Sequence, residues 1–530
     1  MVRSSLCSKA KEALELGPFQ NHPLFPGKDD PGVRRSFSEA IRQVRGQLGR
    51  TYPLYIAGND IVTRQTIRSV NPADPDEVIG LICQANQEDL DKAIRAAQEA
   101  FLSWRDLPAS RRVRFLLDAA DLLRQRIYYW SAWQVLEEGK QWDQAYNDVA
   151  EAIDFLEYYS RQALLLDRPS DMGSYRGEIN HYFYQPKGLT AVIAPWNFPL
   201  AISCGMVSAA IAVGSCVLYK PSSQSAVVGH HLVEIFKEVG LPNGVFNYLP
   251  GPGATIGQGL AEDPRIAVIA FTGSMEVGLS LVGLAARPRP GQDHIKKVIA
   301  EMGGKNAIII DHDADLERAV HAVLYSAFGY QGQKCSACSR LIVVDTIYDR
   351  FVPMLVEQAS KLKIGPAEDP ENYMGPVIDQ AAQRRILEYI DLAAKEGRIL
   401  YRSNVPEKGY YVPMTIVEGI RPDCRIAQEE IFGPVLAVMR AKDFDQALEW
   451  ANATRFALTG AVFSNNRQHL EKARRQFRVG NLYLNRHCVG AMVKVQPFGG
   501  FKLSGTGTKA GGPDYLLHLV DPRSVTEQPL

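Results

Sequence analysis

The sequence predicts an α/β protein in which helices cover parallel sheets on both faces. From residue 189 onward, short apolar runs typical of buried strands alternate with helical stretches, and a second alternation of this kind begins at residue 307. Near-continuous apolar strands separated by helices are typical of parallel sheets that are buried on both sides. Strands are expected at 189–195, 215–222, 245–251, 266–274, 307–311, 340–345, 435–441 and 458–464, and helices at 200–214, 225–240 and 315–329.

The length and charge of the chain limit what it can be. A chain of 530 residues exceeds what one hydrophobic core usually supports, so we expect two or three structural units. Lys plus Arg and Asp plus Glu both total 59, which leaves no net charge. Nucleic-acid binding through bulk electrostatics is therefore disfavoured, although a local basic patch is compatible with these counts.

The eight cysteines are scattered, which indicates free thiols in a reducing compartment. Cys335 and Cys338 form a C-x-x-C pair, but no second pair or nearby His completes a zinc quartet, so no metal is expected. The N-terminus lacks an apolar signal region, and Glu12 and Glu15 argue against a transit peptide. We expect a cytoplasmic protein.

One stretch is long enough on paper to span a bilayer, because no charged residue lies between Lys187 and Lys220. Prolines and glycines interrupt it, and a strand, a turn, a helix and a second strand fit that punctuation better. We therefore expect a buried α/β core and no membrane partner.

The remaining regions are less regular. Residues 1–50 resemble an accessory arm with a helix near 35–48, and helical periodicity recurs at 89–126 and 149–166. Residues 177–184 alternate apolar and polar side chains, as an edge strand does. A partner subunit often covers such a strand.

The nucleotide signals lie at strand ends. A buried strand ends at Thr272, and Gly273–Ser274 then opens a helix whose free N–H groups and dipole suit a pyrophosphate. Lys220 ends its own strand, at the edge where open α/β sheets bind ligands. LPGPGATIG at 249–257 fits either a phosphate loop or an ordinary turn.

Three further residues suggest covalent chemistry. Cys335 lies among small residues in GQKCSAC, an uncrowded setting that can expose a thiol, although a buried structural cysteine is the commoner fate of such a residue. Glu301 lies 34 positions upstream (335 − 301), directly before Met-Gly-Gly and a buried strand. Asn197 follows a strand in an uncharged stretch, where its amide could donate to an oxyanion.

Together these segments resemble the NAD(P)-dependent aldehyde dehydrogenase superfamily. PWNFP, KPS, FTGS, EMGGK, GQKC, EEIFGPV and PFGGFKLSG occur in its order and spacing, from about Tyr52 to the C-terminus. The resemblance implies a Rossmann-type cofactor domain, an α/β catalytic domain and a small β oligomerisation element. It assigns 51–170 and 190–300 to the first, 301–490 to the second, and 171–189 with 505–530 to the third.

The resemblance also implies a mechanism that agrees with the residues themselves. The Cys335 thiolate attacks an aldehyde, and Asn197 with the Cys335 backbone N–H stabilises the oxyanion. Hydride transfer to the nicotinamide leaves a thioester, and Glu301 activates the water that hydrolyses it.

For the cofactor, NAD and/or NADP, the resemblance implies a set of binding residues. Those expected at the adenosine and phosphate end are Trp196, Lys220, Ser222, Ser223, Gly273 and Ser274, and those expected at the nicotinamide ribose are Glu430 and Phe432. Ser223 departs from the family, which often has Glu there to hold the adenosine ribose. Because repulsion toward a 2′-phosphate is then absent, we expect NADP to be accepted, alone or alongside NAD.

Within the superfamily the chain resembles 1-pyrroline-5-carboxylate (L-glutamate γ-semialdehyde) dehydrogenases through GQKCSACSR, VAEAIDFLEYY and VGAMVKVQPFGGFKLSGTGTKAGGPDYL. This implies oxidation of the semialdehyde to L-glutamate, the second step of proline catabolism. The implied substrate residues are Ser336, Gly490 and Ala491 for the carboxylate, Glu151 for the ammonium, and Phe328 and Phe498 along the methylene chain. We expect a homo-oligomer, a dimer or larger, and name a proline dehydrogenase as a candidate partner.

Other functions would leave some of these segments unexplained. A thiol hydrolase needs a His partner, and none of the ten histidines lies in a matching motif. A CoA-acylating relative usually lacks the acid at position 301, and a scaffold would have lost Cys335 or Glu301. A dehydrogenase of another small amino or aliphatic aldehyde remains the alternative.

Overall fold

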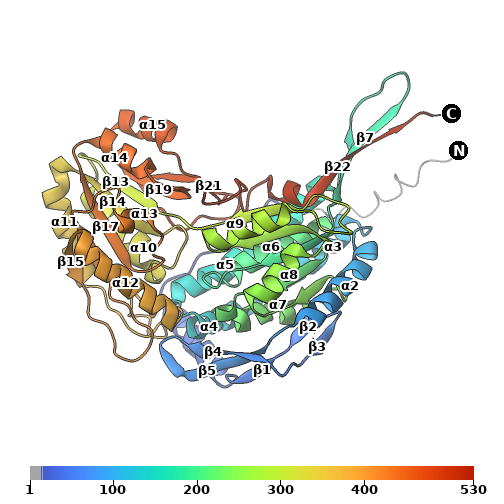
Figure 1. Ribbon diagram of the computed structural model, residues 1–530, viewed down its shortest axis with the longest axis horizontal. Helices are drawn as coiled ribbons and strands as arrows, with labels where there is room; N and C mark the ends of the chain where they lie inside the picture. Colours follow the sequence, from blue (N-terminus) through green and yellow to red (C-terminus); the bar gives the residue numbers. More distant parts are fainter. Residues whose placement is uncertain (1–13, 15, 530) are drawn as a thin grey trace.

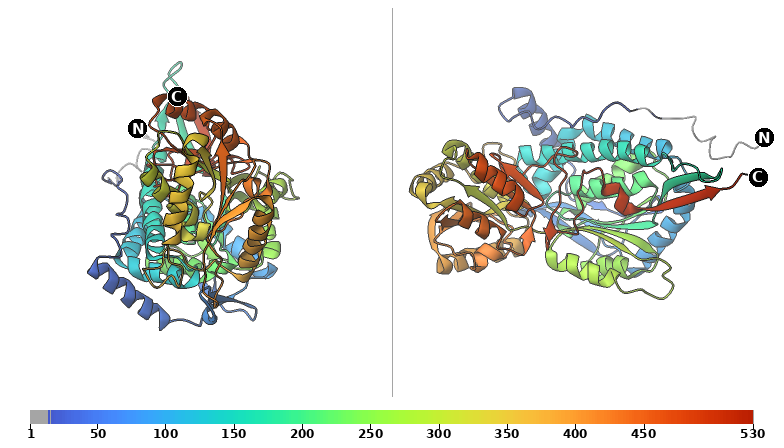
Figure 2. Two further views of the ribbon diagram at one scale, coloured as in Figure 1. Left: turned by 90° about the vertical axis from the view of Figure 1, so that its left-hand side faces the viewer. Right: turned by 90° about the horizontal axis from the view of Figure 1, so that it is seen from above.

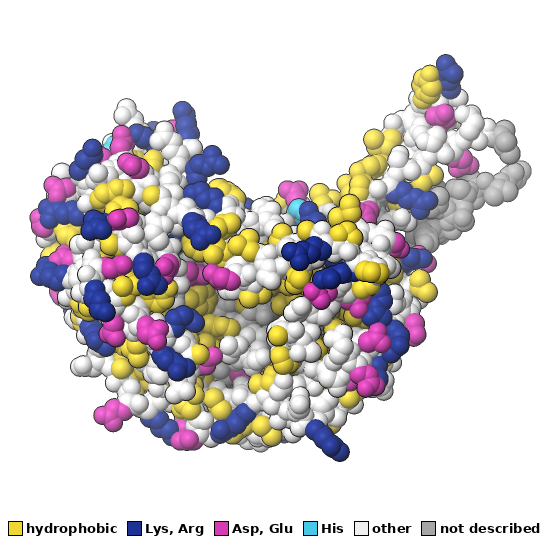
Figure 3. Space-filling model, in the orientation of Figure 1, with side chains coloured by type: hydrophobic (Ala, Val, Ile, Leu, Met, Phe, Trp, Pro, Cys, Tyr) yellow, Lys and Arg dark blue, Asp and Glu magenta, His cyan; other side chains and the backbone are white. Residues whose placement is uncertain are grey.

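The chain folds into two lobes, each built around its own seven-stranded sheet (Figure 1). The structure is a computed structural model that describes residue 14 and residues 16–529. The start of the expected arm, with Cys7, lies outside the described residues. On the face seen in Figure 3, acidic and basic side chains are interspersed, without a large patch of one sign.

The first lobe contains a sheet with strand order β12-β11-β8-β9-β10-β2-β3. Its strands are parallel from β12 to β10, and the antiparallel hairpin β2–β3 forms the far edge. The strands are β2 (Leu54–Ile56), β3 (Asn59–Ile61), β8 (Leu189–Ile193), β9 (Val217–Lys220), β10 (Phe246–Tyr248), β11 (Ile266–Thr272) and β12 (Lys297–Glu301).

Helices pack around this sheet, and the uncharged stretch lies inside it. That stretch forms β8, α6 and β9, and nearly all of these residues are buried, so the expectation of an α/β core is confirmed. No helix of the described chain is long and apolar enough to cross a membrane. The helices of this lobe are α2 (Gln87–Trp104), α3 (Ala109–Gln125), α4 (Ile127–Glu137), α5 (Trp142–Leu166), α6 (Ala201–Val213), α7 (Ala226–Glu238), α8 (Gln258–Glu262) and α9 (Met275–Ala285).

The second lobe contains a sheet with strand order β15-β16-β17-β14-β13-β19-β20, parallel except for the edge strand β15. The strands are β13 (Asn306–Ile310), β14 (Cys338–Val344), β15 (Arg398–Arg402), β16 (Thr415–Glu418), β17 (Val435–Ala441), β19 (Thr459–Phe463) and β20 (Asn481–Leu484). Its helices are α10 (Leu316–Phe328), α11 (Asp345–Ser360), α12 (Gln380–Glu396), α13 (Arg425–Gln428), α14 (Phe444–Asn452) and α15 (Arg467–Gln476).

Three small sheets complete the fold. In one of them, β7 (Ile179–Pro186) pairs along its whole length with β22 (Val520–Glu527) and also with β6 (Ser170–Asp171). This sheet projects from the first lobe (Figures 1 and 2). Its central strand, β7, overlaps the strand predicted at 177–184, but the prediction of an edge strand is wrong, because β7 pairs on both sides. The others consist of β1 (Arg50–Tyr52), β4 (Thr66–Asn71) and β5 (Asp74–Cys83), and of β18 (Phe456–Ala457) and β21 (Phe501–Lys502).

The helix expected near 35–48 is α1 (Pro31–Arg45), which begins four residues earlier and ends three earlier. It begins there because the Asp30 carboxylate accepts hydrogen bonds from the N–H groups of Gly32 and Val33, with Pro31 at the first helical position. The helix is anchored by Phe37, whose ring stacks on Trp142 at a centroid distance of 4.4 Å.

Candidate active site

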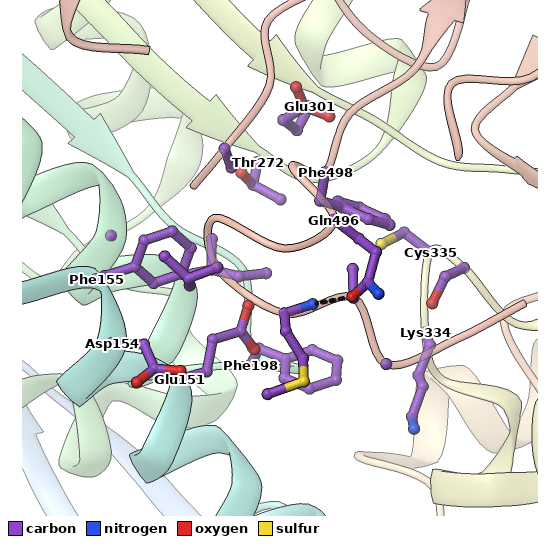
Figure 4. A pocket seen from close by; sticks show the side chains of 18 of the residues that line it. Glu151, Asp154, Phe155, Phe198, Thr272, Glu301, Lys334, Cys335, Gln496 and Phe498 are labelled. Carbon is purple, nitrogen blue, oxygen red and sulfur yellow. Dashed lines mark hydrogen bonds between the residues drawn. The ribbon is translucent and has the colours of Figure 1, made fainter. Parts of the chain in front are cut away.

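A cavity of about 280 Å³ lies between α5, the carboxyl ends of β11 and β12, and the loop that carries Cys335 (Figure 4). A cavity of this volume has room for a small organic ligand. Seven predicted residues from distant parts of the chain line it together: Glu151, Glu301, Cys335, Ser336, Gly490, Ala491 and Phe498.

A strained turn holds Cys335 at the cavity. Tyr330, Gln331 and Gly332 have φ angles of 52°, 57° and 66°, three consecutive residues in the left-handed region. A side chain at Gly332 would begin 2.5 Å from the Gly433 carbonyl oxygen, so only glycine fits there. Non-glycine residues in this conformation cost free energy and persist where tertiary packing imposes them. Cys335 follows this turn and is only partly exposed.

Asn306, which was not predicted from the sequence, also holds the Cys335 loop in place through hydrogen bonds. The Asn306 amide nitrogen donates to the carbonyl oxygens of Cys335 at 2.7 Å and Ala337 at 2.9 Å. Its oxygen accepts from the Thr459 N–H at 2.9 Å. The sequence feature that could have indicated this role is an Asn directly after the EMGGK motif, at the start of β13.

The thiol of Cys335 is neutral in this environment. Its pKa is raised to about 12, mainly by burial and also by the nearby carboxylates of Glu430 and Glu301, whereas the Ser336 N–H opposes them. Forming a thiolate therefore requires a proton acceptor close by.

Glu301 ends β12 and can exchange a proton near neutral pH. Its Oε1 accepts from the Thr508 hydroxyl at 3.0 Å, and its Oε2 has no hydrogen-bond partner among the described residues. Burial raises the pKa of this carboxyl to about 8, while Thr508 and Lys509 lower it. Such a pKa suits a general base at physiological pH.

Asn197 follows β8 and is buried next to the Cys335 loop, and it is not among the residues that line the cavity. Its amide nitrogen donates to the Gln333 carbonyl oxygen at 3.1 Å, two residues before Cys335. An amide carries two N–H groups, and this bond occupies one of them.

Lys220, at the end of β9, is a buried cation without a carboxylate partner among the described residues. Its Nζ donates only to the Pro221 carbonyl oxygen at 3.2 Å, and burial lowers its pKa to about 8. A buried amine of this kind fits a hydroxyl or phosphate ligand. Ser222 donates to the Gln224 side chain at 2.5 Å, and Ser223 lies half-buried beside it.

Gly273 and Ser274 lead from β11 into α9, as expected. The Gly273 N–H donates to the Glu301 carbonyl oxygen at 3.1 Å, which ties this turn to the end of β12. The Ser274 hydroxyl accepts from the Val277 N–H and so satisfies one of the N–H groups expected to be free. Beyond the cap, α9 exposes the apolar side chains of Val277, Leu279 and Val282, which suit the flat face of a purine.

Glu430 and Phe432 come from the second lobe and meet the first one. Glu430 accepts from the Gly304 N–H at 2.9 Å and lies so close to Gly303 that a side chain there would overlap it. Burial raises the Glu430 pKa to about 7. The Phe432 ring packs edge-on against Trp196 at 5.5 Å. These predicted residues therefore lie close together across the two lobes.

Glu151 lies on α5 and faces the cavity (Figure 4). Its pKa is raised to about 8, mainly by burial and also by the neighbouring carboxylates of Asp148 and Asp154, whereas the ammonium groups of Lys140 and Lys334 oppose this shift. Asp148 forms a fully buried ion pair with Lys140 and accepts from the Ala201 N–H at 2.6 Å, which joins α5 to α6. An ammonium ligand would restore the charge of Glu151.

The prediction that Phe328 lies along the methylene chain of the substrate is wrong, because its side chain does not line the cavity. It is fully buried in the core of the second lobe, with Leu324, Cys338 and Val489. The aromatic residues that do line the cavity include Phe155, Phe198 and Phe498. Phe198 directly follows Asn197 in PWNFP, a signal that sequence reasoning did not use.

Comparison with known proteins agrees with this geometry. The protein-family model described as "Aldehyde dehydrogenase family" matches residues 60–525 of this chain. The 1-pyrroline-5-carboxylate dehydrogenase of Geobacillus sp. (strain WCH70) is 48% identical over 511 residues, which are 96% of this chain and 99% of that protein.

Solved structures are similar as well. A crystal structure of 1-pyrroline-5-carboxylate dehydrogenase from Thermus with bound NAD matches at a TM-score of 0.95 and 47% identity, covering 97% of this chain and 100% of that one. Proline utilization A from Bdellovibrio bacteriovorus matches at a TM-score of 0.95 and 46% identity. That match covers 97% of this chain but 54% of the longer protein. The chain therefore belongs to the aldehyde dehydrogenase family.

Proposed function

We propose that the protein oxidises L-glutamate γ-semialdehyde, the open form of 1-pyrroline-5-carboxylate, to L-glutamate. One observation carries this proposal: Glu151 and the Gly490–Ala491 backbone line the same cavity as Cys335 and Glu301. An anion and free backbone donors beside the nucleophile match the ammonium and carboxylate of an amino-acid aldehyde. The 280 Å³ cavity also suits a substrate of this size.

In the proposed reaction, the sulfur of Cys335 forms a bond to the aldehyde carbon. The thiol loses its proton to solvent before the attack, so the Glu301 carboxylate, one of whose oxygens has no hydrogen-bond partner among the described residues, stays unprotonated for the later step. The second N–H of Asn197 and the Cys335 backbone N–H hold the oxyanion. A bound nicotinamide supplies the hydride acceptor. Glu301 then takes a proton from the water that attacks the thioester, which releases the acid and the free thiol.

We propose that both NAD and NADP serve as cofactor. The residues fit a dinucleotide: Lys220 is a buried cation with only a carbonyl partner, and α9 begins at the end of β11 with an exposed apolar face. Ser223 brings no negative charge toward a 2′-phosphate. However, the carboxylate of Asp379 lies nearby, where it accepts from Gln224 at 3.3 Å. That carboxylate supports acceptance of NADP at a lower efficiency than NAD.

The remaining expectations stand as proposals. The division into arm, cofactor, catalytic and oligomerisation parts is consistent with two lobes and a projecting sheet. The long β7–β22 pairing supports a role of that sheet in joining subunits. Free thiols at all described cysteines support a cytoplasmic location. The likeness to a part of proline utilization A supports a proline dehydrogenase as partner.

A substrate panel with both cofactors tests the function. We expect the highest kcat/KM with pyrroline-5-carboxylate, measured by NADH or NADPH absorbance, and a lower value with short aliphatic aldehydes. A preference for propionaldehyde, or for another amino aldehyde such as a betaine precursor, would replace the proposed substrate while leaving the aldehyde dehydrogenase chemistry intact.

A further inference from the structure

The described part of the N-terminal arm contributes Leu24 to the wall of the cavity, and its contacts with α5 are specific. The Asn21 amide nitrogen donates to the Asp154 carboxylate at 2.8 Å, and the His22 N–H donates to the other oxygen of that carboxylate at 2.6 Å. The Phe25 N–H donates to the Asn147 side chain at 2.9 Å. Between them, Leu24 lines the cavity directly.

These arm contacts lie on the same face of α5 as Glu151. Asn147, Glu151 and Asp154 occupy positions i, i+4 and i+7, which form one stripe on a helix. The arm binds the residues one turn before and one turn after Glu151. Glu151 itself stays directed into the cavity (Figure 4), and Leu24 of the arm lines the same cavity.

The arm also holds the loop that carries the expected carboxylate site. The same Asn21 nitrogen that donates to Asp154 donates to the Val493 carbonyl oxygen at 3.0 Å. Val493 lies three residues after Gly490, in a segment of which Gly490, Ala491, Met492 and Val493 all line the cavity. Asn21 therefore links α5 to this loop through a single side chain.

Apolar and polar anchors outside the cavity fix the arm in place. The Phe19 ring packs edge-on against Tyr158 of α5 at 5.2 Å, and the Phe25 ring packs against Tyr146 at 5.7 Å. Arg161 of α5 donates to the Gly17 carbonyl oxygen at 2.9 Å. The segment 17–25 is thus held along α5 on both sides of Asn21.

From these contacts we propose that segment 17–25 is a specificity element of the substrate cavity and that Asn21 is its positioning residue. Asn21 sets the spacing between Glu151, which faces the ammonium, and the Gly490–Ala491 backbone, which faces the carboxylate. Leu24 lines the same cavity. This inference rests on the proposed function, because only a substrate with both charged groups senses that spacing.

Asn21→Ala tests the role of the bridge. We expect KM for pyrroline-5-carboxylate to rise about tenfold, the effect of removing one well-formed pair of hydrogen bonds, with kcat nearly unchanged. KM for propionaldehyde should stay within about twofold, since that aldehyde has neither charged group. Asn465→Ala is the matched control, because Asn465 also donates to a backbone carbonyl, that of Asp313, far from the cavity.

A charge swap separates the two bonds that Asn21 makes. In the double variant Asn21→Asp/Asp154→Asn, the amide at 154 can donate to the carboxylate at 21, so the bond between arm and helix is restored. The carboxylate at 21 cannot donate to Val493, so the bond between arm and loop stays broken. We expect the double variant to regain the thermal stability of the wild type but to keep the raised KM for pyrroline-5-carboxylate.

Three outcomes would be decisive. Equal changes in KM for both aldehydes in Asn21→Ala, or none, would overturn the role of the arm while leaving the proposed function standing. A double variant with wild-type KM would also overturn it, because the link to the loop would then be unimportant. A wild-type enzyme without preference for pyrroline-5-carboxylate over propionaldehyde would instead overturn the proposed function, and the selective role of the arm with it.

Discussion

The two seven-stranded sheets face the active site with opposite ends of their strands. In the first lobe, the carboxyl ends of β9, β11 and β12 reach it and deliver Lys220, Gly273 and Glu301. In the second lobe, the amino ends of β14 and β17 reach it, because Cys335 and Glu430 lie in the turns before those strands. The same kind of sheet thus contributes in two different ways.

The difference shows in the backbone. In the first lobe, the residues at the strand ends have ordinary conformations, and α9 starts directly after β11. In the second lobe, the Cys335 turn contains three successive left-handed residues, and Phe432 before β17 has a φ of 56°. Binding at carboxyl ends follows from the general geometry of parallel sheets. Placing a nucleophile at an amino end takes a strained turn that tertiary contacts must hold.

The largest effect is expected from a substitution of Cys335, which follows the strained turn of the second lobe. Cys335→Ala should lower kcat by about 10⁴-fold or more, because no other thiol of the described residues lines the cavity. Cys338→Ala, three positions on and buried in β14, should keep kcat within about threefold per folded molecule. Steady-state assays with circular dichroism as a folding check measure both. If the two variants lost activity equally, the turn would have no special role.

The second-largest effect is expected from a substitution of Glu301, the acid at the end of β12 in the first lobe. Glu301→Gln should lower the steady-state rate by about 10²–10⁴-fold while leaving a rapid first turnover, since thioester hydrolysis loses its base. Stopped-flow absorbance should show one equivalent of reduced cofactor per site. Absence of that burst would assign Glu301 to the first chemical step instead.

The pH profile of the wild type sharpens the role of Glu301. Only the deprotonated carboxylate acts as a base, so with a pKa of about 8 the hydrolytic rate should rise as pH increases through 8 and fall below it. Thr508→Ala removes a hydrogen bond that favours the carboxylate, and the midpoint should therefore move to higher pH. A profile unchanged by this variant would show that another group sets the pH dependence.

A smaller effect is expected from α5, which belongs to neither sheet edge. Glu151→Ala should raise KM for pyrroline-5-carboxylate about 10–100-fold, the range of a charge-assisted hydrogen bond, and leave KM for propionaldehyde nearly unchanged. KM values for both aldehydes with each variant measure this. Equal effects on the two aldehydes would remove Glu151 from the substrate site.

The smallest effect concerns the end of β9. Ser223→Glu should lower kcat/KM with NADP by about fivefold or more through repulsion of the 2′-phosphate, and should leave NAD unchanged or improved. Asp379→Asn should raise kcat/KM with NADP, because it removes a negative charge near the 2′-phosphate. A wild type that already rejects NADP would contradict the cofactor proposal.

How far the sequence reached depends on the kind of residue. Cys335 and Glu301 were predicted from their local motifs, and Glu151 and Ser336 from the family resemblance, and all four line one cavity. Phe328 came from the same resemblance and was misplaced. Whether an aromatic ring at the end of α10 faces the core or the cavity depends on the packing of a whole lobe, and no local pattern records it.

By itself, the sequence determined the alternation of strands and helices, the motifs at their ends and the residues able to do the chemistry, since all of these follow from local periodicity and residue type. Only the tertiary structure decided that Asn306 pins the Cys335 loop, that Thr508 binds Glu301, and that Asn21 reaches across to Val493. Those contacts join residues 29 to 472 positions apart. They also set the burial that raises the carboxyl pKa values, and such long-range contacts exist only once the lobes have packed.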